Sequence, residues 1–143
     1  MSSADVSAEM SIRVFGYCQA TPAEVATLIH SGRDREVVRF GGNFVVVAER
    51  AQDVWIITSA YGVVAYFYSH GPTWFSHGPT VRTVLRDGAI EWRWNAEAVA
   101  DLLTLEHLTG CSSLHASVER TPAASVLHWE GDPALGCHLV RDP

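Results

Sequence analysis

An internal repeat holds the residues whose types and spacing first suggest chemistry. The sequence SHGPT occurs at residues 69–73 and again at 76–80, so His70 and His77 lie seven residues apart. Imidazole nitrogens bind zinc, but a zinc site needs three or four converging ligands, and no spacing around the repeat supplies the others. The Gly-Pro pair after each histidine is typical of turns. We therefore expect turns here and no metal ion.

Two side chains could act as nucleophiles on an amide. Ser2 becomes the first residue once Met1 is removed, and Cys18 ends a run of strand-forming residues. A nucleophile needs a rigid support near an oxyanion hole, and residues 2–5 (SSAD) have no strand pattern. A thiol at the end of an apolar strand is more typical of core packing than of catalysis. We expect no catalytic residue, and a small amidohydrolase using Cys18 or Ser2 is the alternative.

Composition excludes several other classes of function. The chain has 10 basic residues, all of them arginine, and a net charge of -6. Without lysine there is no Schiff-base chemistry, and the scattered arginines form no patch for nucleic acid or for an anionic membrane. No Gly-x-Ser-x-Gly segment supports a Ser/His/Asp triad. We expect no cofactor and no nucleic-acid partner.

The cysteines and the N-terminus bear on the compartment. Cys18, Cys111 and Cys137 are odd in number and lack Cys-x-x-Cys spacing. The first residues lack the charged-then-apolar form of a signal peptide, and no apolar run reaches the roughly 20 residues of a membrane span. We expect a cytoplasmic protein with reduced thiols.

Three apolar runs must form the sheet that positions these groups. Residues 43–48, 54–58 and 63–68 have no polar face, and turn residues at 50–53 and 60–62 separate them as in a meander. An antiparallel sheet usually leaves one face in water, so a sheet with two apolar faces must be covered on both sides. A helix layer and a second sheet are the simplest cover, which predicts an α+β fold.

Capping signals predict helices outside the meander. The first helix begins after Thr21, with Pro22 and Glu24 completing a capping box, presents Val25, Leu28 and Ile29 to the core, and ends near Gly32. A short helix over residues 80–86 ends at Gly88.

The clearest helix begins at Asn95 and runs to Gly110. Asn95 caps it, and its predicted core face is formed by four apolar residues, Val99, Leu102, Leu103 and Leu108. His107 lies in the last turn, where a cation suits the helix dipole, so we expect a structural role for it.

Further strands complete the expected domain. Residues 11–18 and 74–76 read as strands, and residues 126–129 and 137–140 as a terminal hairpin. Residues 1–10 are rich in serine and alanine without periodicity, which predicts a disordered lead-in before a single domain at 11–143.

Short motifs follow one another in a recognisable order. They are a strand ending in Gly16-Tyr17-Cys18, a helix, GGNFVVV at 41–47, WIITSAYG at 55–62, YFY at 66–68, WFS at 74–76, an Asn-capped helix and VERTP at 118–122. This order resembles the N-terminal domain of asparagine-synthetase-like enzymes, with its Gly-x-Phe strand, Asp-x-x-Gly-x-x-x-x-Tyr-Tyr hairpin, Phe-x-Ser strand and Pro-Pro-Gly turn. The chain is most similar to the actinobacterial branch of lasso-peptide-type macrolactam cyclases, whose first matching strand also ends in Gly-x-Cys.

The resemblance implies a class II glutamine-amidotransferase-like domain with the N-terminal-nucleophile fold. That fold is an αββα sandwich of two antiparallel sheets between helix layers. Active members place a cysteine directly after the initiator methionine and use it, with its own amine as base, to hydrolyse glutamine. The ammonia then reaches an ATP-dependent synthetase domain.

The chain departs from this pattern at each catalytic point. Ser2 stands in the place of the cysteine, Phe15-Gly16 aligns with the Asn-Gly of the oxyanion hole, and Ser59 replaces the Asp of the Asp-x-x-Gly hairpin. The upstream strands that carry the substrate-gripping arginine have no counterpart, so we expect a sandwich truncated at its N-terminal strands. The Ser-Gly-Gly-x-Asp-Ser loop of the synthetase domain is absent from the sequence.

We therefore expect a catalytically degenerate amidotransferase-like domain, a scaffold or accessory subunit of an ATP-dependent amide or macrolactam synthetase in peptide natural-product biosynthesis. A stand-alone module that binds a precursor peptide or small ligand is a further alternative to the amidohydrolase. Missing strands would leave the meander with an uncovered face and an unpaired edge. We therefore expect a homodimer when the chain is alone, with strands and not the helix at 95–108 in its interface, or else a complex with a synthetase partner.

Overall fold

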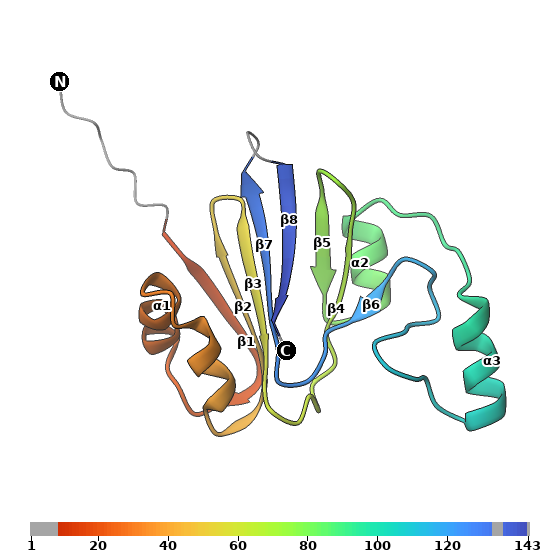
Figure 1. The fold of residues 1–143 in the computed structure, drawn as a ribbon, viewed down its shortest axis with the longest axis horizontal. Helices are drawn as coiled ribbons and strands as arrows, with labels where there is room; N and C mark the ends of the chain where they lie inside the picture. Colours follow the sequence, from red (N-terminus) through yellow and green to blue (C-terminus); the bar gives the residue numbers. More distant parts are fainter. Residues whose placement is uncertain (1–8, 133–135, 143) are drawn as a thin grey trace.

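The protein is a mixed α+β fold with two antiparallel sheets, seen in a computed structural model that describes residues 9–132 and 136–142 (Figure 1). Sheet A has the strand order β1 (Ser11–Cys18), β2 (Gly42–Arg50), β3 (Asp53–Thr58), β7 (Val126–Asp132) and β8 (Gly136–Asp142). Sheet B has the order β5 (Phe75–Gly78), β4 (Phe67–His70) and β6 (Glu119–Arg120). The predicted α+β class is confirmed.

The elements form layers in the order helix, sheet, sheet, helix. Figure 1 shows α1 (Pro22–His30) on the outer side of sheet A, sheet B on its other side, and α2 (Val81–Asp87) beyond sheet B. The short 3₁₀ helix η1 (Asp34–Arg39) joins α1 over sheet A. The predicted cover on both faces of the sheet is therefore confirmed for the strands at 43–48 and 54–58.

Strand β2 contributes to two separate cores because its side chains alternate. Phe44, Val46 and Ala48 are fully buried in the core under α1 and η1. Val45 and Val47 are fully buried in the core between the two sheets. The run at 43–48 has no polar face because both faces of β2 are buried, as the prediction of a sheet covered on both sides required.

The third predicted strand of the meander was placed in the wrong sheet. After Thr58 the chain turns at Gly62, whose N–H donates to the Ser59 carbonyl at 3.1 Å, and β4 begins at Phe67 in sheet B. The strand that pairs with the free side of β3 is β7. An apolar run has the same pattern in either sheet, because Tyr66 and Tyr68 face the core that the two sheets share.

Helix α1 confirms its predicted start. Thr21 Oγ1 accepts from the Glu24 N–H at 3.3 Å, and Glu24 Oε2 accepts from the Thr21 N–H at 2.8 Å, which completes the capping box. Val25 and Ile29 are buried against sheet A, and Leu28 is partly buried there. Helix α2 is also confirmed, with Thr80 as its N-cap and Gly88 at its end.

Helix α3 (Ala96–Leu105) has the predicted Asn95 cap but neither the predicted length nor the predicted core face. It ends at Leu105 because Glu106 takes a left-handed conformation with φ 60°. Ala98 is its buried residue, whereas Leu102 and Leu103 are 41% and 79% exposed. The amphipathic pattern predicts a face, but here no sheet lies against it.

Two glycines allow β1 and β2 to approach closely at one end. Gly16 has φ +86°, and a Cβ there would lie 2.3 Å from the Asn43 carbonyl oxygen. Gly42 has φ +124°, and a Cβ there would lie 2.1 Å from the Tyr17 carbonyl oxygen. Any side chain at either position would move the strands apart.

Three further predictions about strands and turns can be compared with the structure, and the strand expected at 74–76 is found as β5 (Phe75–Gly78), in sheet B and not in the sheet of the meander. The strand at 11–18 has its predicted bounds, Gly71-Pro72-Thr73 of the first SHGPT copy form the β4–β5 turn, and β7 and β8 form the terminal hairpin. In the second copy Ser76, His77 and Gly78 lie in β5 and not in a turn. The predicted disordered lead-in falls mostly on residues 1–8, outside the described residues. No helix among the described residues combines the length and apolar composition that crossing a bilayer requires.

Candidate functional site

A polar cleft opens at one end of the space between the two sheets. It has a volume of about 240 Å³ and is lined by Arg13 of β1, Glu49 of β2, Tyr66, His77 of β5 and Asp87 of α2, among others. Strand alternation places Arg13 and Glu49 on the same face as the partly buried Phe15 and the fully buried Val47. The cleft is therefore the polar end of the core that the two sheets share.

Four of these side chains form a continuous chain of contacts. Arg13 Nη2 donates to Glu49 Oε2 at 3.1 Å, and Glu49 Oε1 lies 3.3 Å from His77 Nε2. His77 Nδ1 lies 3.0 Å from the Tyr66 hydroxyl. Because a carboxylate only accepts hydrogen bonds, Nε2 carries the proton, and the Tyr66 hydroxyl then donates to Nδ1. The carboxylate thus orients the imidazole, and the imidazole satisfies a buried hydroxyl.

The environment keeps His77 neutral and Tyr66 protonated. Burial lowers the pKa of His77, although the Glu49 carboxylate acts in the opposite direction. Burial raises the pKa of Tyr66 to about 12. At neutral pH, Tyr66 is therefore not a phenolate nucleophile. His77 is a neutral imidazole whose Nδ1 lone pair already accepts the hydrogen bond from the Tyr66 hydroxyl.

The hydroxyl groups near His77 are also occupied. Ser76 Oγ donates to the Val84 carbonyl at 2.8 Å, and Thr83 Oγ1 lies 2.9 Å from Thr80 Oγ1. Among the described residues that line the cleft, no hydroxyl points to a free base. This arrangement can bind a ligand and exchange a proton at His77, but it lacks an activated nucleophile.

The structure does not bring the sequence-predicted catalytic positions together. Cys18 packs against the core under α1, on the other side of sheet A from the cleft, and burial raises its pKa. A reactive thiol needs the opposite shift. Ser59 is fully buried and its Oγ accepts from the Phe44 N–H at 3.2 Å, while the Phe15 ring lies 5.1 Å from that of Tyr66. Ser2 lies outside the described residues.

The two repeat histidines lie in different surroundings. His77 contacts Tyr66 and Glu49, whereas His70 is exposed, with ring centroids 6.4 Å from Tyr68 and 6.1 Å from Trp129. Among the side chains of residues 9–131, no group of three or more His, Cys, Asp or Glu is placed to hold a metal ion.

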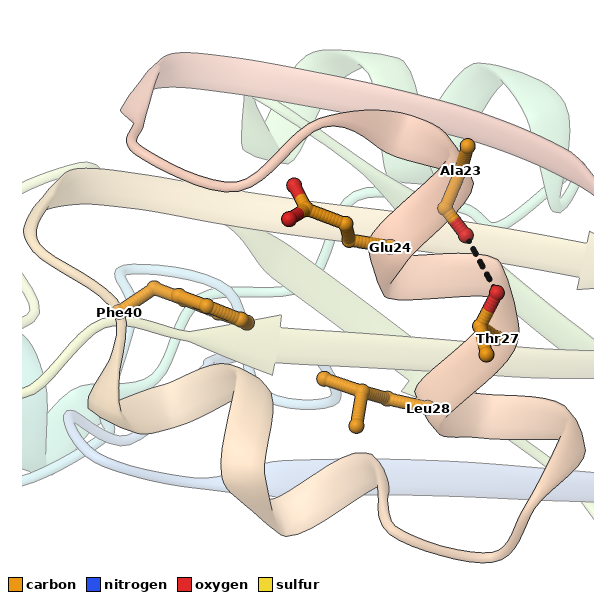
Figure 2. A pocket seen from close by; sticks show the side chains of 5 residues that line it. All are labelled: Ala23, Glu24, Thr27, Leu28 and Phe40. Atoms are coloured by element: carbon orange, nitrogen blue, oxygen red, sulfur yellow. Dashed lines mark hydrogen bonds between the residues drawn. The ribbon is translucent and has the colours of Figure 1, made fainter.

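A second hollow lies on the outer surface between α1 and η1. Its volume is about 380 Å³, and Figure 2 shows Leu28 and Phe40 pointing toward each other across it. Thr27 Oγ1 donates to the Ala23 carbonyl at 2.9 Å, and the Glu24 carboxylate is used by the capping box. This hollow can accept an apolar group, and the hydroxyl of Thr27 and one carboxylate oxygen of Glu24 are engaged in hydrogen bonds within α1 and its cap.

Sequence reasoning missed the cleft because its members come from four separate segments. Tyr66 and His77 are 11 positions apart, and Glu49 lies on the other sheet. One available signal was Glu49 itself, a carboxylate on the same strand face as two buried valines. The chain matches no protein-family model and no curated protein.

Proposed function

We propose that this chain is a catalytically degenerate glutamine-amidotransferase-like domain of the N-terminal-nucleophile type. It acts in the cytoplasm as a scaffold or accessory subunit of an ATP-dependent, asparagine-synthetase-like amide or macrolactam synthetase in peptide biosynthesis. One observation carries the proposal: the positions aligned with the family's oxyanion hole and acid, Phe15 and Ser59, are used for packing and for a backbone hydrogen bond.

The architecture and the thiol chemistry support the same proposal. The layers follow the order helix, sheet, sheet, helix, which is the order of the αββα sandwich. Cys18 has a raised pKa, because burial disfavours its thiolate. A domain that keeps this sandwich, and in which burial disfavours the thiolate of Cys18, is suited to binding rather than to amide hydrolysis.

The experiment is a glutaminase and asparaginase assay on the purified chain. We expect ammonia release at the background level. Cys18→Ala and Ser2→Ala should leave that level unchanged, and Cys111→Ala, at another half-buried cysteine, is the matched control. Ammonia release above background that disappears in Cys18→Ala or Ser2→Ala, but persists in Cys111→Ala, would establish the amidohydrolase instead.

A stand-alone ligand-binding module is the second candidate, and the polar cleft favours it. The guanidinium of Arg13 contacts Glu49 through one nitrogen, and the structure records no other partner for it among the described residues. Its remaining N–H groups are available to a ligand at the mouth of the cleft. Co-purification with the synthetase separates the two candidates, because a stand-alone module does not require it.

The proposed self-association rests on one edge of sheet A. Both faces of β2 and β3 are covered, so the uncovered face expected for the meander is absent from the described part of the chain. The unpaired edge is present: β1 is the first strand of sheet A, with Tyr17 70% exposed. Pairing between two β1 strands about a twofold axis would cover it. Light scattering that gives a monomer at all concentrations would remove this proposal.

A further inference from the structure

Helix α3 lies on the surface with its apolar face largely free. It makes at most slight contact with the other described helices and strands, and Figure 1 shows it at the far side of the molecule from α1. Val99, Leu102 and Leu103 share one face because they are three and four residues apart. Ala98 on the edge of this face is 1% exposed, whereas Leu103 is 79% exposed.

The segment that leads into α3 exposes two indole rings. Trp92 and Trp94 are 51% and 62% exposed, with ring centroids 5.1 Å apart in an edge-to-face arrangement. Single exposed apolar residues are ordinary, but five large exposed apolar side chains lie within residues 92–105, and large exposed apolar areas mark interaction sites. We call Trp92, Trp94, Leu102, Leu103 and Leu105 the α3 surface.

The α3 surface is held in place before any partner binds. His115 is buried, its Nε2 lies 3.0 Å from the Glu91 carbonyl oxygen, and the Ser117 N–H donates to its Nδ1 at 3.1 Å. The Asn95 N–H donates to the Leu114 carbonyl at 2.9 Å, and the Asn95 side chain caps α3. These contacts fix the segment before the helix, which lowers the entropy cost of binding.

The charges around the α3 surface have one predominant sign. Residues 91–106 include four acidic side chains and one basic one, Arg93, and the helix itself has no basic residue. Glu97 and Glu106 are exposed at its two ends. An apolar face bordered by carboxylates complements an apolar groove bordered by basic groups.

We propose that the α3 surface docks into an apolar, basic-rimmed groove of the ATP-dependent synthetase. This inference rests on the proposed function, because the synthetase is the partner named there. A second copy of the chain is a poorer occupant, since two α3 surfaces would bring their carboxylates together. An anionic membrane is also a poorer occupant, because membrane-surface helices carry Lys and Arg on their polar face.

The test uses the full chain and an asparagine-synthetase-like protein of the same organism, with affinity measured by calorimetry. We expect the unmodified chain to bind and Leu103→Asp to weaken binding by about tenfold or more, as loss of a central apolar anchor does. Tyr61→Asp is the matched control, because Tyr61 is 82% exposed but lies in the turn after β3, outside the α3 surface. Circular dichroism should give the same folded spectrum for both variants.

The outcomes separate the docking surface from the proposed function. If the unmodified chain binds and Leu103→Asp binds equally well, the docking surface is wrong and the proposed function stands. If the unmodified chain does not bind the synthetase, both are wrong. If Leu103→Asp instead dissociates a homodimer, or abolishes binding to phosphatidylserine vesicles, then a second copy or a membrane is the occupant and the docking proposal fails.

Discussion

Helices α1 and α3 begin in the same way and end in different environments. Each has a side-chain cap, at Thr21 and Asn95, and each has an amphipathic pattern. Yet α1 buries Val25 and Ile29 against sheet A, whereas α3 buries Ala98 and leaves Leu103 exposed. The comparison shows that caps and periodicity determine where a helix forms, but not whether its own chain covers its apolar face.

The two helices therefore differ in what removing their apolar contacts should cost. The apolar residues around α1 belong to a core whose packing stabilises the whole sheet. The leucines of α3 are in water already, so they contribute little to folding and are available for a partner.

The largest contrast is expected between a core residue under α1 and a surface residue of α3. Phe44→Ala should lower the free energy of unfolding by about 3–5 kcal/mol, because it removes a fully buried ring and leaves a cavity. Leu103→Ala should change it by less than about 0.5 kcal/mol, since the side chain is exposed. Urea unfolding followed by circular dichroism measures both. Similar losses for the two variants would mean that α3 is packed in solution.

A smaller contrast is expected between the two repeat histidines. His77→Ala should cost about 1–3 kcal/mol, because the buried Tyr66 hydroxyl loses its partner. His70→Ala should cost less than about 0.5 kcal/mol at an exposed position. The repeat alone predicts small effects for both. Thermal unfolding with and without EDTA is the control, and a lower melting temperature in EDTA would indicate the metal site that we do not expect.

The pH dependence of stability should extend the comparison to the two cores. In each core the structure describes a histidine whose pKa is lowered by burial. His77 lies at the core between the sheets, and His128 stacks on Trp55 in the core under α1, with ring centroids 4.2 Å apart. An unfolded histidine takes up a proton near pH 6.5, before the folded one does. Stability should therefore fall as pH drops below about 6.5, by at most about 1.4 kcal/mol per pH unit for each histidine, and level off below the folded pKa values. His77→Gln should make this slope shallower, and an unchanged slope would contradict the assignment.

The smallest contrast is expected between the two helix caps. Thr21→Ala should lower global stability by about 1 kcal/mol, because α1 is part of the main core. Asn95→Ala should loosen α3 locally, with faster hydrogen exchange at residues 98–103 and little change in global unfolding. Equal global losses would show that α3 unfolds together with the sheets.

Patterns within one element predicted much of the fold. Thr21, Pro22 and Glu24 defined the start of α1, and the doubly apolar runs around Phe44 and Trp55 required layers on both sides of sheet A. The run at 63–68 failed because periodicity reports burial and does not identify the neighbouring strand. Its sheet is decided by the crossover at Gly62, a tertiary feature.

The polar cleft could not be predicted in the same way. His77 acquires its partners because Glu49 and Tyr66 approach it from two different sheets, and its partial burial there favours the neutral imidazole. In the sequence it is one of two identical turn motifs, and nothing local separates it from His70. Which of two equivalent residues acquires partners is determined by strand pairing.

The close approach at Gly16 and Gly42 has a consequence for misfolding. In most sheets a one-residue slip exposes apolar side chains to water, and this cost prevents the slip. Strand β2 has apolar residues on both faces, so a one-residue slip against β1 would only exchange the side chains of one buried face for those of the other. The free-energy cost of that slip would be much smaller. The two glycines make such a slip unfavourable for a steric reason. After a slip, a residue with a side chain would replace a glycine at the close approach, where a Cβ atom would lie within 2.3 Å of a carbonyl oxygen of the other strand. Because neither residue has a side chain, the pair favours one alignment of β1 and β2 over its neighbours.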